Sequence, residues 1–307
     1  MPQINLRPMA RLSTVGISIA LALVPATAMA MHFSAWGMAV PETGINSPQA
    51  DGCPIESPDG LELYIASNRG GGGDPNDIWV AHRDSIGGPW STPANLGAPV
   101  NSPAADFCPT PLRGNRLLFV STRAGADACG TAPAGDIYLA RRNPHHGWGT
   151  PLHLGCDADG TGPNFPGAEF GPSLVETAEG TFLYFSSNGY GGDQDIYASR
   201  MRSDGSFGPA SVVQELSTAA DDFMPNVRKD GLEIVFNSNR PGSTLNTAGL
   251  PSQDVYTATR ASTADAWSAP INLGPAVNTA GNETRSSLSG DGRRLHFGRD
   301  GDIFVSE

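Results

Sequence analysis

The stretch Trp90-Ser91-Thr92-Pro93 recurs in varied form through the chain from Trp36 onward. The five copies are Trp36-Gly37-Met38-Ala39, Trp90-Ser91-Thr92-Pro93, Trp148-Gly149-Thr150-Pro151, Phe207-Gly208-Pro209-Ala210 and Trp267-Ser268-Ala269-Pro270. Their first residues lie at positions 36, 90, 148, 207 and 267, and are therefore 54, 58, 59 and 60 residues apart. A nearly constant spacing of this size indicates a repeat architecture.

Two further patterns recur in phase with the first. One is an Asp-(Ile/Val)-aromatic triplet, found as Asp77-Ile78-Trp79, Asp136-Ile137-Tyr138, Asp195-Ile196-Tyr197, Asp254-Val255-Tyr256 and Asp302-Ile303-Phe304. The other is an alternating apolar stretch that ends in a polar corner, as in Leu63-Tyr64-Ile65-Ala66-Ser67-Asn68-Arg69. Short runs of β-branched and aromatic residues bounded by Gly, Pro, Asn or Asp predict strands, and Asp59-Gly60 favours a tight hairpin turn. Four such segments in each unit are typical of a propeller blade.

We therefore predict an all-β fold, a five-bladed β-propeller of four-stranded antiparallel blades. The last unit stops at Glu307 and lacks its outermost strand, whereas the segment from Phe33 to Gly37 precedes the first complete unit. An N-terminal strand that closes the last blade would hide sheet edges that otherwise invite aggregation. The prediction is thus a ring whose two chain ends interlock.

The recurring patterns resemble the WD40-like repeats of TolB-type bacterial periplasmic proteins, in which a Pro, a Ser/Asp-Gly turn, a Phe-x-Ser-x-Arg stretch and an Asp-Ile-Tyr triplet follow one another. The resemblance covers residues 33–307. It implies a propeller fold and little about function, because the shared positions are mainly turn and core positions. Six blades are usual in the TolB propeller, so the five predicted here argue against transferring its partner interactions.

The first thirty residues have the layout of a secretory signal peptide. Arg7 and Arg11 precede an apolar stretch from Val15 to Val24, and small residues follow at Ala28 and Ala30. We predict a signal peptide over residues 1–30, cleaved after Ala28 or Ala30, and a single propeller domain over residues 31–307. The apolar run is too short to span a membrane. These features predict a periplasmic or secreted protein.

The net charge is strongly negative. It is −12 for the whole chain, and removal of two arginines with the signal peptide gives −12 − 2 = −14. Such a chain repels nucleic acid and anionic lipid. The expected partner is therefore an envelope protein or a small-molecule or glycan ligand, and nucleic acid is excluded.

Four cysteines in an exported protein favour disulfides. Cys53 and Cys108 occupy equivalent places in adjacent units, whereas Cys129 and Cys156 lie in two loops of one unit. Three pairings are open, and we prefer Cys129–Cys156 because flexible loops can adapt to the required geometry. Zinc binding is an alternative, but the chain has no Cys-x-x-Cys pair.

One acid stands just before each predicted inner strand, and we call this set the acidic ring. It comprises Asp51, Asp106, Glu169, Asp222 and Glu283. Five carboxylates around a narrow mouth would repel one another unless cations or donors offset them. Arg69, Arg123 and Arg240 could pair with them between blades. Alternatively, the acidic ring could form a binding site for a hard cation, with calcium as the candidate cofactor.

Long insertions place loops on the face that carries the acidic ring, and loops on a rigid scaffold are where binding usually resides. We therefore predict a binding or scaffold protein that takes a ligand or protein partner on its loop-rich face. One alternative is a calcium-dependent or carboxylate-based hydrolase or lyase that acts on glycans or phosphate esters. The other is a purely structural role in envelope assembly.

Overall fold

The structure is a computed structural model that describes residues 36–70, 75–125, 128–130 and 134–307. Contacts divide the chain into residues 1–33 and residues 34–307. The predicted signal peptide lies outside the described residues, and the account below concerns the second unit. Its described part contains no helix with the length and apolarity needed to cross a membrane.

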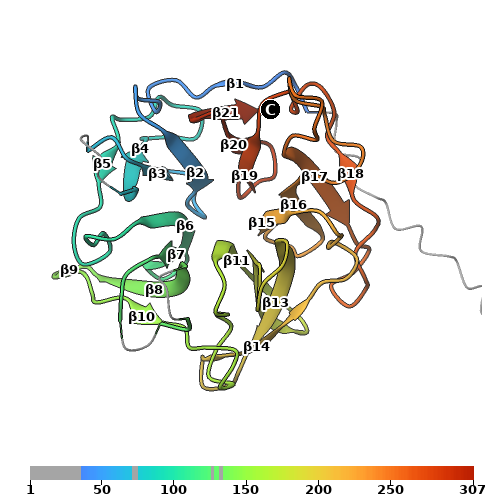
Figure 1. The fold of residues 1–307 in the computed structure, drawn as a ribbon. Helices are drawn as coiled ribbons and strands as arrows, with labels where there is room; N and C mark the ends of the chain where they lie inside the picture. Colours follow the sequence, from blue (N-terminus) through green and yellow to red (C-terminus); the bar gives the residue numbers. More distant parts are fainter. Residues whose placement is uncertain (1–35, 71–74, 126–127, 131–133) are drawn as a thin grey trace, which may run out of the picture. The chain divides into compact units, whose positions relative to one another are not determined.

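Five antiparallel sheets surround a common centre, as predicted, and the innermost strand of each faces that centre (Figure 1). Blade one contains β2 (Asp51–Glu56), β3 (Glu62–Ser67), β4 (Asp77–His82) and β5 (Ala94–Asn95). Blade two contains β6 (Asp106–Leu112), β7 (Arg116–Ser121) and β8 (Asp136–Asn143), with its outer position divided between β9 (Gly147–Trp148) and β10 (Leu152–His153). Blade three contains β11 (Glu169–Thr177), β12 (Gly180–Ser187), β13 (Asp195–Met201) and β14 (Phe207–Val212).

The last two blades follow the same plan. Blade four contains β15 (Asp222–Val227), β16 (Glu233–Ser238), β17 (Asp254–Thr259) and β18 (Ile271–Asn272). Blade five contains β19 (Glu283–Leu288), β20 (Leu295–Arg299), β21 (Asp302–Ser306) and β1 (Val40–Pro41). The last blade is thus completed by a strand from the other end of the domain, as the sequence predicted.

The closing strand lies slightly later in the chain than expected. Val40 pairs with Val305, and the Gly37 N–H donates to the Glu307 carbonyl at 2.9 Å. The segment from Phe33 to Gly37 was predicted to form this strand. The difference has a regular cause, because the outer strand begins four residues after the tryptophan at Trp36, Trp90, Trp148 and Trp267 alike.

The hydrophobic core is divided into five clusters, each of which packs one blade against the next. Between blades one and two, for example, Ile55 and Ile78 pack with Leu117 and Phe119, all of them nearly inaccessible to solvent. Burial of such side chains contributes about 1.5–3 kcal/mol each relative to exposure. Successive side chains along a strand point to opposite faces of the sheet. Because both faces of every blade pack against a neighbouring blade, the strands contain runs of apolar residues.

Each inner strand contains a bulge two residues beyond its acid. The residue there has a positive φ in all five blades: Cys53, Cys108, Gly171, Met224 and Arg285. At Gly171 a Cβ would approach the Met224 Cα to 2.5 Å and the Arg285 Nη1 to 2.7 Å, so only glycine fits. These positions therefore crowd the centre of the ring.

The centre is filled by side chains. Cys53 and Cys108 form a disulfide that links blades one and two. Arg285 of blade five is fully buried and donates to the Thr110 Oγ1 at 2.8 Å and to the Pro172 and Pro225 carbonyls, both at 3.2 Å. Burial lowers the pKa of Arg285 to about 9, so the guanidinium stays charged at neutral pH. We call Arg285 and the Cys53–Cys108 disulfide the central plug.

Candidate functional site

The acidic ring is buried. Its five carboxyl groups begin the inner strands, and their residues are between 0% and 3% exposed. Four of them are bound by an arginine: Arg69 to Asp51 at 2.5 Å, Arg123 to Asp106 at 2.6 Å, Arg240 to Asp222, and Arg299 to Glu283 at 2.7 Å. These carboxylates therefore face protein donors and not an open mouth.

The arginine pairing differs from the prediction in two ways. Each arginine belongs to the same blade as its acid, not to a neighbouring blade, because the register pairs Asp51 with Ser67 and so places Arg69 beside it. Arg299, which was not among the expected partners, supplies the fourth pair. The ion pairs therefore tie the first and second strands of one sheet together.

A repeated hydrogen-bond donor was not predicted from the sequence. A Ser or Thr four residues before the acid donates its backbone N–H to the carboxylate: Ser47 to Asp51, Ser102 to Asp106, Thr218 to Asp222 and Thr279 to Glu283. The residue before it is often an asparagine whose amide pairs with the backbone of the Asp-Ile-aromatic triplet, as Asn101 does with Ile78. The recurring Ser or Thr is visible in the sequence, and it indicates that each of these acids holds the loop before its strand in place.

The cation interpretation of the acidic ring is not supported by this arrangement. In four blades the carboxylate oxygens already accept hydrogen bonds from an arginine and from backbone N–H groups. Two residues further along the inner strands, the central plug fills the ring with side chains of its own. A calcium ion needs six to eight oxygen ligands, and these oxygens are committed elsewhere.

Glu169 is the exception within the acidic ring. Gly189 stands at the position that carries the arginine in blades one, two and four, and the Phe165 ring centroid lies 4.7 Å from that of Tyr197. Oε1 of Glu169 accepts from the Ser187 hydroxyl at 2.7 Å, whereas Oε2 is buried without a hydrogen-bond partner among the described residues. Burial, and next the nearby Asp136 carboxylate, raise the pKa of Glu169 well above its usual range. The protonated form of Glu169 is therefore favoured.

This raised pKa predicts a specific pH dependence of stability. The unfolded chain releases the Glu169 proton near the ordinary value of 4.5, whereas the folded protein retains it to higher pH. The free energy of unfolding should therefore fall as pH rises from about 4.5 towards the raised pKa. Chemical denaturation of wild type and Glu169→Gln across this range should show a smaller decline in the variant, and equal slopes would contradict the assignment.

The loop cysteines form the expected Cys129–Cys156 disulfide. Together with His153 they bring three potential metal ligands within 4.8 Å of one another. The hydrogen bonds of His153 argue against zinc, because Nδ1 accepts the Gly155 N–H at 3.1 Å and the proton must then lie on Nε2, which is 2.9 Å from Asp136. A protonated Nε2 cannot bind a metal, and both sulfurs are engaged in the disulfide.

The face opposite the acidic ring is hollowed between the blades. A hollow of about 420 Å³ opens between blades one and two, and we call it the arginine pocket. Its walls are the hairpins that end the inner strands, because β2 and β6 run from the acidic ring towards this face. It is lined by Ser57, Pro58, Asp59, Glu62, Tyr64, Pro111, Leu112, Arg113, Gly114, Asn115, Arg116, Arg142 and Trp148. The predicted binding surface was the loop-rich face, whereas the arginine pocket lies on the opposite face.

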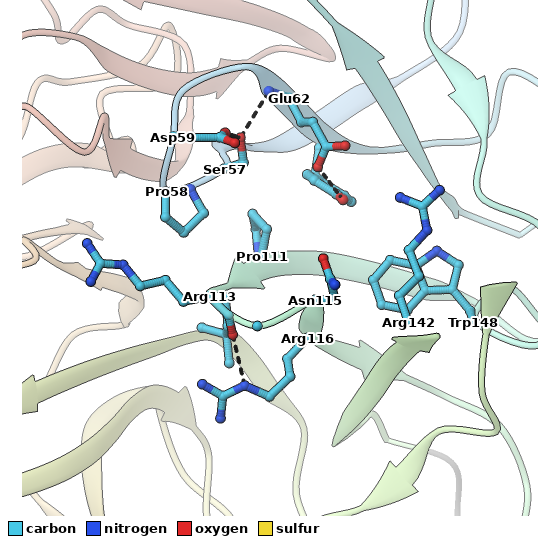
Figure 2. A pocket seen from close by; sticks show the side chains of 13 residues that line it. Ser57, Pro58, Asp59, Glu62, Pro111, Arg113, Asn115, Arg116, Arg142 and Trp148 are labelled. Carbon is cyan, nitrogen blue, oxygen red and sulfur yellow. Dashed lines mark hydrogen bonds between the residues drawn. The ribbon is translucent and has the colours of Figure 1, made fainter. Parts of the chain in front are cut away.

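Figure 2 shows the two walls of the arginine pocket to be oppositely charged. Asp59 and Glu62 project from blade one, whereas Arg113, Arg116 and Arg142 come from blade two, with Trp148 beside Arg142. Within the described residues, none of these three arginines pairs with a carboxylate. Most other described arginines are bound to an acid or to backbone carbonyls, whereas Arg113 and Arg142 have neither and Arg116 donates only to the Arg113 carbonyl.

Hydrogen bonds set the charge of Asp59 and orient Glu62 on the acidic wall. The Ser57 hydroxyl and the Leu61 N–H hold the pKa of Asp59 below its usual range, so it remains an anion. Tyr64 donates its hydroxyl to Glu62 at 2.8 Å, and burial together with Glu62 raises the pKa of Tyr64. The pocket therefore offers carboxylate acceptors, guanidinium donors and an indole face, a combination suited to a ligand with hydroxyl groups and a negative charge.

No family of known sequences and no curated protein matches this chain. Among solved structures it is similar to an endo-arabinase from Bacteroides thetaiotaomicron VPI-5482, with 16% identity, 88% of this chain and 96% of that chain covered, and a TM-score of 0.52. It is also similar to an alpha-L-arabinofuranosidase from Lactobacillus brevis (12% identity, 87% and 93% covered, TM-score 0.54). A putative TolB from Agrobacterium tumefaciens matches with 15% identity, 85% and 76% covered, and a TM-score of 0.48. At such identities the likeness concerns the fold: the chain is a five-bladed β-propeller.

Proposed function

We propose that this protein is an exported β-propeller that binds a carbohydrate ligand carrying a negative charge in the arginine pocket. The observation that carries the proposal is the cluster of Arg113, Arg116 and Arg142, which has no carboxylate partner within the described residues and lines a hollow beside Trp148. In a chain of net charge −12, a surface hollow with three unpaired cations is an attractive site for an anion.

Two further observations support a carbohydrate. Trp148 is half-buried and presents an aromatic surface, while Asp59, Glu62 and Asn115 supply acceptors and donors for hydroxyl groups. Structural neighbours include proteins described as an endo-arabinase and an arabinofuranosidase, whose names denote action on carbohydrates. The two disulfides and the predicted signal peptide fit export.

Replacement of Trp148 with alanine should weaken ligand binding at least about tenfold, because an aromatic contact at the centre of a site is often worth more than 1 kcal/mol. A glycan array with neutral, carboxylated and sulfated members identifies the ligand, and calorimetry measures the loss. Trp90→Ala is the matched control. Trp90 holds the same repeat position in blade one but packs on Arg83, 4.0 Å from its ring centroid, outside the pocket. Equal losses in both variants, or no anionic glycan bound by wild type, would overturn the proposal.

We favour binding over hydrolysis because of the state of the acids. Glycoside hydrolysis uses two carboxyl groups that reach the substrate, about 5–5.5 Å apart for retention or 6.5–9.5 Å for inversion. The acidic ring is buried, and four of its members are held by arginines. Chromatography of the bound glycan after prolonged incubation tests this choice, and release of shorter products by wild type but not by Glu169→Gln would restore the hydrolase alternative.

A further inference from the structure

A second hollow adjoins the arginine pocket and reaches the centre of the same face. It measures about 300 Å³ and is lined by residues from all five inner-strand hairpins, including Lys229 and Gly290. The two hollows share six lining residues, namely Ser57, Pro58, Pro111, Leu112, Arg113 and Arg116. They therefore form one continuous depression, which we call the rim-to-centre groove.

Cationic side chains are distributed along this groove. Arg142 lies in the outer hollow only, Arg113 and Arg116 line both hollows, and Lys229 lies in the central hollow only. Among the described residues none of the four is paired with a carboxylate, and the Arg116 guanidinium donates only to the Arg113 carbonyl, at 3.0 Å. Unpaired positive charge thus extends from one end of the groove to the other.

The other charged residues of the central hollow largely neutralise one another. Arg228 pairs with Asp230 and Glu233, while Glu56 pairs with Arg83 and Arg294. Glu176 is exposed at the edge of the hollow and is its remaining acid. The net positive charge of the central hollow therefore comes from Arg113, Arg116 and Lys229.

We propose that the rim-to-centre groove binds an anionic polysaccharide chain, with one sugar beside Trp148 and successive acidic units along Arg142, the Arg113 and Arg116 pair, and Lys229. A single charged sugar could contact only one end of this row, whereas a repeated charge along a chain meets every cation in turn. The proposal rests on the proposed function, since the first subsite is the arginine pocket.

The experiment measures binding as a function of chain length. Galacturonate oligomers of one, three and six units serve as carboxylated probes, a chondroitin sulfate hexasaccharide as the sulfated probe, and carboxyl-reduced hexamer as the neutral control. We expect one of the charged hexamers to bind at least about tenfold more tightly than its monosaccharide, and added salt to weaken that binding because exposed charges are screened.

Two substitutions locate the chain. Lys229→Gln should weaken hexamer binding several-fold and leave monomer binding unchanged, whereas Trp148→Ala should weaken both. Lys229 is the only lysine in the chain, so acetylation of lysine gives a second, independent way to remove that charge. Arg293→Gln is the control, because Arg293 is exposed on the corresponding hairpin of blade five but lines neither hollow.

The outcomes separate the two proposals. If a charged monosaccharide binds as tightly as its hexamer and Lys229→Gln has no effect, the groove does not bind a polysaccharide chain, but the arginine pocket remains a site for a charged sugar. If the neutral hexamer binds as well as the charged one, the assignment of an anionic ligand falls with it. If none of the probes binds to wild type, both the groove and the proposed function fail.

Discussion

Replacing Asp222 with asparagine should lower the free energy of unfolding by about 3–5 kcal/mol, the usual consequence of removing one member of a buried ion pair. Asp222 is fully buried, and its two oxygens accept from different donors, Oδ1 from Arg240 and Oδ2 from the Thr218 N–H at 2.7 Å. An asparagine amide must point its NH2 group at one of these donors. The change keeps the shape of the side chain, so a cavity contributes little to the loss.

Glu169→Gln is the matched control, because it makes the same chemical change at the equivalent position of blade three. Glu169 has no arginine partner among the described residues and its raised pKa favours the uncharged form, so an uncharged amide can keep the acceptor role of Oε1. At neutral pH this variant should be as stable as wild type or more stable. Urea denaturation at pH 7 compares the two variants. Similar losses of unfolding free energy in both would show that the arginine partner is not the cause of the loss at Asp222.

Deleting residues 36–41 should produce the second large effect, a fall in melting temperature together with self-association. The deletion removes β1 and with it the pairing to β21, the Gly37 to Glu307 hydrogen bond and the packing of Trp36 against the last blade. The exposed edge of β21 can then pair with another chain. Differential scanning calorimetry and light scattering report the two consequences.

Trp36→Ala alone serves as the control for the deletion. It removes the side chain but leaves the strand, so it should lower the melting temperature without causing self-association. A deletion variant that stays monomeric and melts with wild type would show that β1 does not close the ring.

The repeated residues allowed much of the fold to be predicted, and the unrepeated ones explain what was missed. The blade number, the interlocked ends and the Cys129–Cys156 disulfide followed from patterns that recur or from loop placement. The Cys53–Cys108 disulfide followed only as the remaining pair, because its geometry depends on a bulge that turns both side chains to the centre of the ring. Burial of the acidic ring was missed for a related reason, since the Ser or Thr four residues earlier was not recognised as its partner.

The arginine pocket could not be found by comparing the repeats. Arg142 shares its repeat position with Arg83 and Arg260, and Arg116 shares its position with Arg294, so the residue types alone do not single these arginines out. Their proximity depends on how two neighbouring hairpins pack, which no periodic pattern encodes. The difference lies in their partners: Arg83 and Arg294 pair with Glu56, whereas Arg116 and Arg142 have no carboxylate partner among the described residues.

The central plug has a consequence for how the whole molecule unfolds. In many repeat proteins each unit touches only its neighbours, so stability is a sum of local terms and parts can melt separately. Here Arg285 of blade five donates to residues of blades two, three and four, and a disulfide joins blades one and two. Blade five therefore contacts blades two and three across the centre, although neither is its neighbour in the ring. Five similar units are thereby made into one cooperative body.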